Sequence, residues 1–90
     1  MLQLIYMLIE FYGQECEHCH AMEPLVKKFQ HEFDVPVTLY ETWHNAENEK
    51  LRQQYDKGFC GGVPFFYNTD TNKYICGEAD YEELKTWAGK

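Results

Sequence analysis

The sequence begins with a run of hydrophobic residues from Leu2 to Phe11 that only Gln3 and Glu10 interrupt. A half-exposed strand alternates apolar and polar side chains, whereas a nearly continuous apolar run is typical of a strand buried on both faces. The run is too short to span a bilayer. It has no basic residue and no small-residue cleavage site, which argues against a secretory signal. We therefore expect a buried strand, as in a parallel sheet that helices cover on both sides.

Farther along the chain, the hydrophobic period changes to that of a helix between Cys16 and Phe33. Its apolar stripe consists of Met22, Val26, Phe29 and Phe33. Pro24 lies inside this helix and predicts a kink. We expect further strands at residues 37–43, 63–67 and 73–76, and further helices at residues 46–58 and from residue 80 onward. Asp80 and Glu83 have the spacing of a capping box for the last helix.

These elements follow one another in the order β-α-β-α-β-β-α. The first crossover is long enough for a right-handed parallel unit, and the last two strands form a hairpin around the turn-rich segment NTDTN. The sequence therefore predicts an α/β fold with a central four-stranded mixed sheet and helices on both faces. With no linker, repeat or low-complexity tract, residues 1–90 are expected to form a single domain.

Acidic residues outnumber basic ones, with 15 Asp and Glu against 8 Lys and Arg, which gives a net charge of −7. Binding to nucleic acid depends on attraction to phosphates, and this charge would repel them. We therefore expect no nucleic acid or membrane partner. We also expect a monomer. The sequence favours a cytoplasmic protein, or one of an organelle stroma or matrix if a targeting peptide has been removed.

The segment FYGQECEHCHAMEP holds Cys16 and Cys19, two of the four cysteines. A zinc site usually needs four ligands, often as two close pairs, and Cys60 and Cys76 are too far apart to form a second pair. A lone Cys-x-x-Cys beside a β-α-β pattern favours a redox couple, so we expect no metal site. At the mouth of a helix, Cys16 gains thiolate character from the free N–H groups. We expect Cys16 to be an exposed nucleophile and Cys19 a sheltered resolving thiol.

The chain resembles the thioredoxin superfamily over nearly its whole length. The resemblance rests on five features in order: Glu10 in the first strand, Cys16-Glu17-His18-Cys19, Pro24, Gly62-Val63-Pro64 and Gly77. It implies a thioredoxin-like fold that lacks the extra N-terminal strand and helix of thioredoxins. In size the chain is similar to glutaredoxins and to small thioredoxin-like proteins of archaea and bacteria.

The resemblance also implies roles for individual residues. Glu10 corresponds to a buried acid that takes the proton of Cys19, although a strand-edge carboxylate in contact with water is the alternative. His18 resembles a histidine of disulfide isomerases that donates to the thiolate of Cys16. Pro64 corresponds to a cis-proline. The substrate groove is then rimmed by Tyr12, Gly62, Val63 and Gly77.

The function that this resemblance implies is thiol–disulfide oxidoreduction between the Cys16–Cys19 couple and protein disulfides. Such an enzyme needs no cofactor beyond its dithiol, and a reductase or a low-molecular-weight thiol recycles it. Two alternatives stay open. One is a glutathione-coupled, glutaredoxin-like enzyme. The segment Glu78-Ala79-Asp80 loosely resembles the pair of acidic residues with which glutaredoxins bind glutathione. The other is a metal-binding or redox-sensing module without turnover.

Cys60 and Cys76 also have two interpretations. They are either small buried hydrophobic residues or a second disulfide or regulatory thiol near the active site. Sequence does not determine disulfide connectivity, so both interpretations remain.

Overall fold

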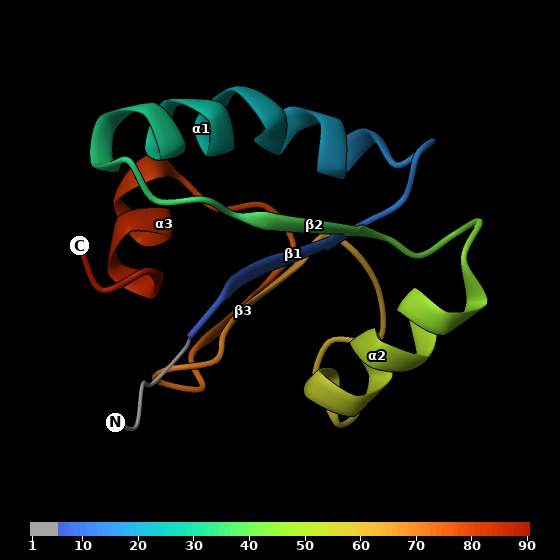
Figure 1. The fold of residues 1–90 in the computed structure, drawn as a ribbon. Helices are drawn as coiled ribbons and strands as arrows, with labels where there is room; N and C mark the ends of the chain where they lie inside the picture. Colours follow the sequence, from blue (N-terminus) through green and yellow to red (C-terminus); the bar gives the residue numbers. More distant parts are fainter. Residues whose placement is uncertain (1–5) are drawn as a thin grey trace.

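The structure is a computed structural model and describes residues 6–90. Its elements follow the predicted order β-α-β-α-β-β-α (Figure 1). Their bounds are β1 (Leu8–Tyr12), α1 (Glu17–Phe33), β2 (Thr38–Glu41), α2 (Ala46–Asp56), β3 (Phe65–Asn68), β4 (Tyr74–Cys76) and α3 (Tyr81–Trp87). The first strand was expected to begin at Leu2, and residues 2–5 lie outside the described residues.

The four strands form one mixed sheet in the order β2-β1-β3-β4. β1 pairs in parallel with β2 and antiparallel with β3, so that Glu10 lies opposite Leu39 on one side and Phe66 on the other. β3 pairs antiparallel with β4. Every residue of β1 from Leu8 to Phe11 is buried, which confirms the prediction of a strand covered on both faces.

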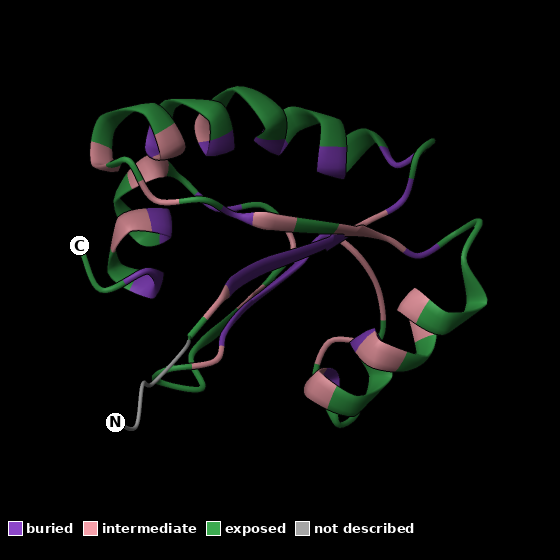
Figure 2. Cartoon of the chain, in the orientation of Figure 1, coloured by how far each residue is buried: buried purple, intermediate pink, exposed green. Residues whose placement is uncertain are grey.

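Helices cover both faces of this sheet, as predicted: α1 and α3 lie on one face and α2 lies on the other (Figure 1). Alternate residues of β1 and β3 face the two layers. Phe66 packs with Phe29 and Leu84 under α1 and α3, whereas Phe11 and Phe65 belong to the core beneath α2. Figure 2 shows buried residues along β1 and on the side of α1 that faces the sheet. Burying side chains of this size stabilises the fold by roughly 1.5–3 kcal/mol each.

The ends of the helices follow from local capping. The N-cap of α1 is Cys16, in an extended conformation, and α1 continues through Pro24 as one helix. Asp80 caps α3, and its carboxylate and that of Glu83 form the predicted reciprocal capping box. Each arrangement satisfies N–H groups that a helix start leaves without intrahelical partners.

Three strands are shorter than predicted, and of these β4 differs only in starting at Tyr74 in place of residue 73. β2 was expected over residues 37–43 but ends at Glu41, whose carboxylate accepts from the backbone N–H groups of Trp43 and His44 and turns the chain. β3 was expected from residue 63 but starts at Phe65, because Pro64 has no N–H for a strand ladder. Among the helices of residues 6–90, none has the length and apolarity needed to cross a membrane.

Candidate active site at the Cys16–Cys19 disulfide

Cys16 and Cys19 form a disulfide at the N-terminus of α1. The chain leaves β1 at Tyr12 and turns at Gly13, whose carbonyl accepts from the N–H of Cys16 at 3.0 Å. The N–H of Cys19 donates to the sulphur of Cys16 at 3.1 Å. This donor and the positive end of the helix dipole favour a thiolate at Cys16 over one at Cys19.

Both cysteines are buried, with exposed fractions of 5% for Cys16 and 3% for Cys19. The expected contrast between an exposed and a sheltered sulphur was therefore wrong for this disulfide form. The physical reason is the neighbouring loop, because the carbonyl oxygen of Val63 lies 4.0 Å from the sulphur of Cys16. The difference between the two cysteines is one of electrostatic surroundings, not of exposure.

The loop that precedes β3 supplies the second wall of the site. The peptide bond between Val63 and Pro64 is cis, and Val63 presents its carbonyl to Cys16. Behind them, the N–H of Gly77 donates to the carbonyl of Pro64 at 2.9 Å. The structure thus brings Val63 to Cys16 and Gly77 to Pro64, and it places half-buried Gly62 next to them in the same loop.

Glu10 is buried beneath the disulfide, and its exposed fraction is 5%. Burial, with a smaller contribution from the negative charge of Glu23, raises the pKa of Glu10 to about 8. A cavity of about 170 Å³ is lined by both Glu10 and Cys19. Tyr12 also lines this cavity, and its place at the rim of the substrate groove stays a prediction. The cavity gives the carboxyl and the inner cysteine a shared space.

The imidazole of His18 is exposed, and its Nδ1 lies 2.5 Å from a carboxylate oxygen of Glu78. This hydrogen bond and the charge of Glu78 raise the pKa of His18. The Nδ1 atom of His18 is therefore hydrogen-bonded to Glu78 in this structure. Donation from His18 to the Cys16 thiolate stays a prediction. His44 pairs similarly with Glu15, at 2.8 Å.

Sequence reasoning missed three supports of the site. The carboxylate of Glu41 accepts from the N–H of Gln14 at 2.9 Å, which fixes the loop before Cys16. Trp43 lies across this loop so closely that a Cβ on Gly13 would be 2.3 Å from its ring. These contacts join residues about 30 positions apart, and no local pattern indicates them.

The third missed support is Asp56, which ends α2 just before the loop that carries Val63. Cys60 and Cys76 form a disulfide, so the interpretation as two unpaired hydrophobic residues was wrong. Asp56 is buried and accepts from the backbone N–H of Cys60 and of Gly61. The sequence held one indication of a role for Asp56. Arg52 and Asp56 have the i, i+4 spacing of an ion pair on a helix, and this pair is observed at 2.6 Å.

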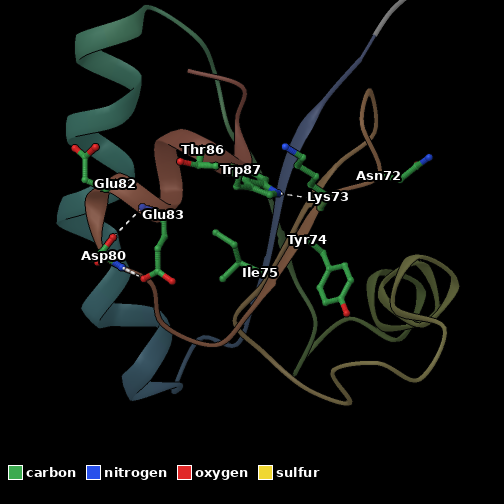
Figure 3. Close-up of a pocket in the computed structure, with 9 residues that line it drawn as sticks. All are labelled: Asn72, Lys73, Tyr74, Ile75, Asp80, Glu82, Glu83, Thr86 and Trp87. Carbon is green, nitrogen blue, oxygen red and sulfur yellow. Dashed lines mark hydrogen bonds between the residues drawn. The ribbon is translucent and has the colours of Figure 1, made fainter.

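A groove of about 600 Å³ lies apart from the cysteines, between β4 and α3 (Figure 3). Ile75 and Trp87 line it, and the indole N–H of Trp87 donates to the carbonyl of Lys73 at 3.2 Å. None of the residues expected to form the active site lines this groove.

Solved structures with the same fold include several thioredoxins. A mutant thioredoxin from Halobacterium salinarum is 22% identical, with a TM-score of 0.72 over 92% of this chain and 74% of that one. The short form of thioredoxin f from spinach chloroplast is 25% identical, with a TM-score of 0.71 over 93% of this chain and 73% of that one. Mitochondrial thioredoxin 3 from Saccharomyces cerevisiae is 18% identical, with a TM-score of 0.63 over 90% of this chain and 74% of that one.

No curated protein sequence matches the chain. The sequence model of the family described as Thioredoxin matches residues 3–90. Together with the disulfide of Cys16 and Cys19, this match supports thiol–disulfide oxidoreductase chemistry in general. The chain belongs to the thioredoxin family.

Proposed function

We propose that the protein exchanges its Cys16–Cys19 couple with disulfides of protein substrates. The observation that carries this proposal is the asymmetry around the two sulphurs. Cys16 caps α1 and faces the Val63 carbonyl, whereas Cys19 shares a cavity with the buried acid Glu10. One sulphur is thus placed for attack on a substrate, and the other is placed for proton transfer within the protein.

In the first step, the thiolate of Cys16 attacks one sulphur of the substrate disulfide. A bond forms between Cys16 and that sulphur, the substrate disulfide breaks, and the other substrate sulphur leaves as a thiolate that takes a proton from water. The helix N-terminus and the N–H of Cys19 supply the stabilisation that a thiolate at Cys16 needs.

In the second step, Glu10 accepts the proton of Cys19 across the shared cavity, and the thiolate of Cys19 attacks Cys16. The Cys16–Cys19 disulfide forms as the bond between Cys16 and the substrate breaks. The second substrate sulphur leaves as a thiolate that takes a proton from water, and Glu10 releases its proton to water, so the substrate gains two electrons and two protons in all. A base works best when its pKa is near the working pH, and the pKa of Glu10, about 8, meets this condition.

Substrate binding uses the backbone next to Cys16. The carbonyl of Val63 lies beside the reacting sulphur, and an extended substrate segment gains affinity by hydrogen bonding to backbone in this way. Such binding depends little on substrate side chains, which suits an enzyme for protein disulfides.

The reaction needs no cofactor beyond the dithiol. A reductase or a low-molecular-weight thiol returns the Cys16–Cys19 disulfide to the dithiol, and we place this cycle in the cytoplasm or in an organelle stroma or matrix. Both directions of exchange are chemically open to the couple, because thiol–disulfide exchange is reversible.

The test is insulin reduction with dithiothreitol as the terminal reductant. The wild type is expected to accelerate precipitation of the insulin B chain over dithiothreitol alone, and Cys16→Ser is expected to abolish the acceleration. Ala21→Ser, an exposed position on the same helix, is the matched control and should retain it. Absence of acceleration by the wild type would refute the proposal, and activity only on glutathione mixed disulfides would favour the glutathione-coupled alternative.

A further inference from the structure

The loop of residues 57–64, between α2 and β3, carries the Val63 carbonyl but has no regular structure of its own. Gly58 and Gly61 adopt positive φ angles of 86° and 79°. A Cβ at Gly61 or Gly62 would have no heavy atom within 4 Å, so little packing surrounds this part of the loop. Glycine-rich backbone loses much conformational entropy when it is ordered. The loop therefore needs specific ties to hold Val63 in place.

The first tie is the carboxylate of Asp56, at the end of α2. It accepts from the N–H of Cys60 at 2.5 Å and from that of Gly61 at 2.7 Å. Its exposed fraction is 2%, and the buried guanidinium of Arg52 balances its charge at 2.6 Å. A buried charge is costly unless it is paired and hydrogen-bonded. Here Arg52 pairs with the carboxylate of Asp56, and the loop N–H groups of Cys60 and Gly61 supply its hydrogen bonds.

The second tie is the disulfide between Cys60 and Cys76. Cys76 ends β4 and lies opposite Phe65 in the sheet, so the disulfide fastens the loop to a strand that is itself hydrogen-bonded. The residue after Cys76 is Gly77, and its N–H donates to the carbonyl of Pro64, the residue that follows Val63. The chain is therefore fastened both before and after Val63.

We propose that Asp56 and the Cys60–Cys76 disulfide are positioning groups for substrate binding, which hold the Val63 carbonyl beside Cys16. The inference rests on the proposed function. It adds that the Cys60–Cys76 disulfide contributes to substrate binding and takes no part in the thiol–disulfide exchange at Cys16 and Cys19. It follows that loss of either tie weakens binding of an extended substrate, while the chemistry at Cys16 and Cys19 is preserved.

The experiment is single-turnover oxidation of an extended dithiol peptide by the oxidised protein, without added reductant. The peptide dithiol becomes a disulfide as the Cys16–Cys19 disulfide becomes a dithiol, so electrons balance. The variants are Cys60→Ala/Cys76→Ala and Asp56→Asn. Glu47→Gln, an exposed acid on the same helix, is the matched control for Asp56→Asn.

Both variants are expected to raise the half-saturating peptide concentration about three- to tenfold. A loss of affinity of this size corresponds to about one hydrogen bond between protein and peptide. The limiting rate should stay within about twofold, because the reacting groups are untouched. The Cys16–Cys19 reduction potential should match that of the wild type. An unchanged half-saturating concentration, or a fall in the limiting rate alone, would overturn the inference.

Amide hydrogen exchange separates this inference from the proposed function. If the wild type neither oxidises the peptide nor accelerates insulin reduction, the proposed function fails. Whenever the peptide is not oxidised, the loop is judged by amide exchange alone. Faster exchange at Gly61 and Gly77 in the Cys60→Ala/Cys76→Ala variant supports positioning of the loop by the disulfide. Exchange that matches the wild type in this variant and in Asp56→Asn refutes it.

Discussion

Replacement of Glu10 by Gln tests whether an ionisable group is buried under the active-site disulfide at a cost to stability. Glu10 is the buried acid of β1, and burial raises its pKa to about 8 from an ordinary value of 4.5. Glutamine has nearly the same size and cannot ionise. The substitution therefore removes the charge and leaves the packing of the strand in place.

The expected magnitude follows from linkage between proton binding and folding. Each tenfold difference in proton affinity between the two states is worth about 1.4 kcal/mol. The unfolded chain ionises Glu10 above about pH 4.5, whereas the folded protein ionises it only near pH 8. Unfolding is therefore favoured progressively as the pH rises through this window, and the effect levels off above it. Between pH 6 and pH 9 the wild type should lose about 2.5–3 kcal/mol relative to the glutamine variant.

The assay is urea unfolding of the oxidised proteins at several pH values, followed by tryptophan fluorescence. In the disulfide form Cys19 does not titrate, so Glu10 is the group that distinguishes the two proteins. The histidines titrate in both, and their contributions cancel in the difference. Glu47→Gln, which removes an exposed carboxylate, serves as the control and should show no comparable slope.

A difference in unfolding free energy that is constant from pH 6 to pH 9 would refute the reasoning. Glu10 would then be a solvated residue, and the proton acceptor of the proposed mechanism would be lost. A stability difference that follows the expected slope, combined with unchanged turnover, would show that Glu10 is buried but does not accept the proton.

Three further predictions concern other parts of the molecule. Replacing both Cys60 and Cys76 with alanine should lower the unfolding free energy of the oxidised protein by about 3 kcal/mol, because the disulfide closes a loop of sequence separation 16; a loss below about 1 kcal/mol in urea unfolding would contradict this entropic estimate. Glu78→Gln should lower the pKa of His18, because the Glu78 carboxylate provides the hydrogen bond and charge that raise it, and an unaltered NMR titration of the imidazole would show that the pair does not persist in solution. Asn68→Ala should cost about 1–3 kcal/mol, because this buried amide donates to a backbone carbonyl of α3 at 2.9 Å; calorimetry that finds the stability unchanged would contradict the contact.

The parts of the fold that sequence predicted are those with a strong local pattern. The apolar run around Leu8 required burial on both faces, and the stripe that includes Met22 and Phe29 required a helix against the sheet. The capping box of Asp80 is likewise a short-range arrangement. Each depends on residues within a few positions, where period and spacing constrain the structure directly.

The parts of the site that sequence did not predict depend on long-range contacts. His18 pairs with Glu78, 60 positions away, and the buried state of Cys16 depends on Val63, 47 positions away. The pairing of Cys60 with a second cysteine was left open for the same reason. Only the assembled sheet brings these residues together, so propensity and periodicity carry no information on them.

The most direct test of the central claim is trapping of the mixed disulfide by Cys19→Ser. The reduced variant is incubated with a protein disulfide, and the product is digested and mapped by mass spectrometry. The account predicts a stable mixed disulfide through Cys16, because the thiol that would resolve it is absent. A mixed disulfide through Cys60 or Cys76 alone, or the same yield from Cys16→Ser through Cys19, would contradict the account.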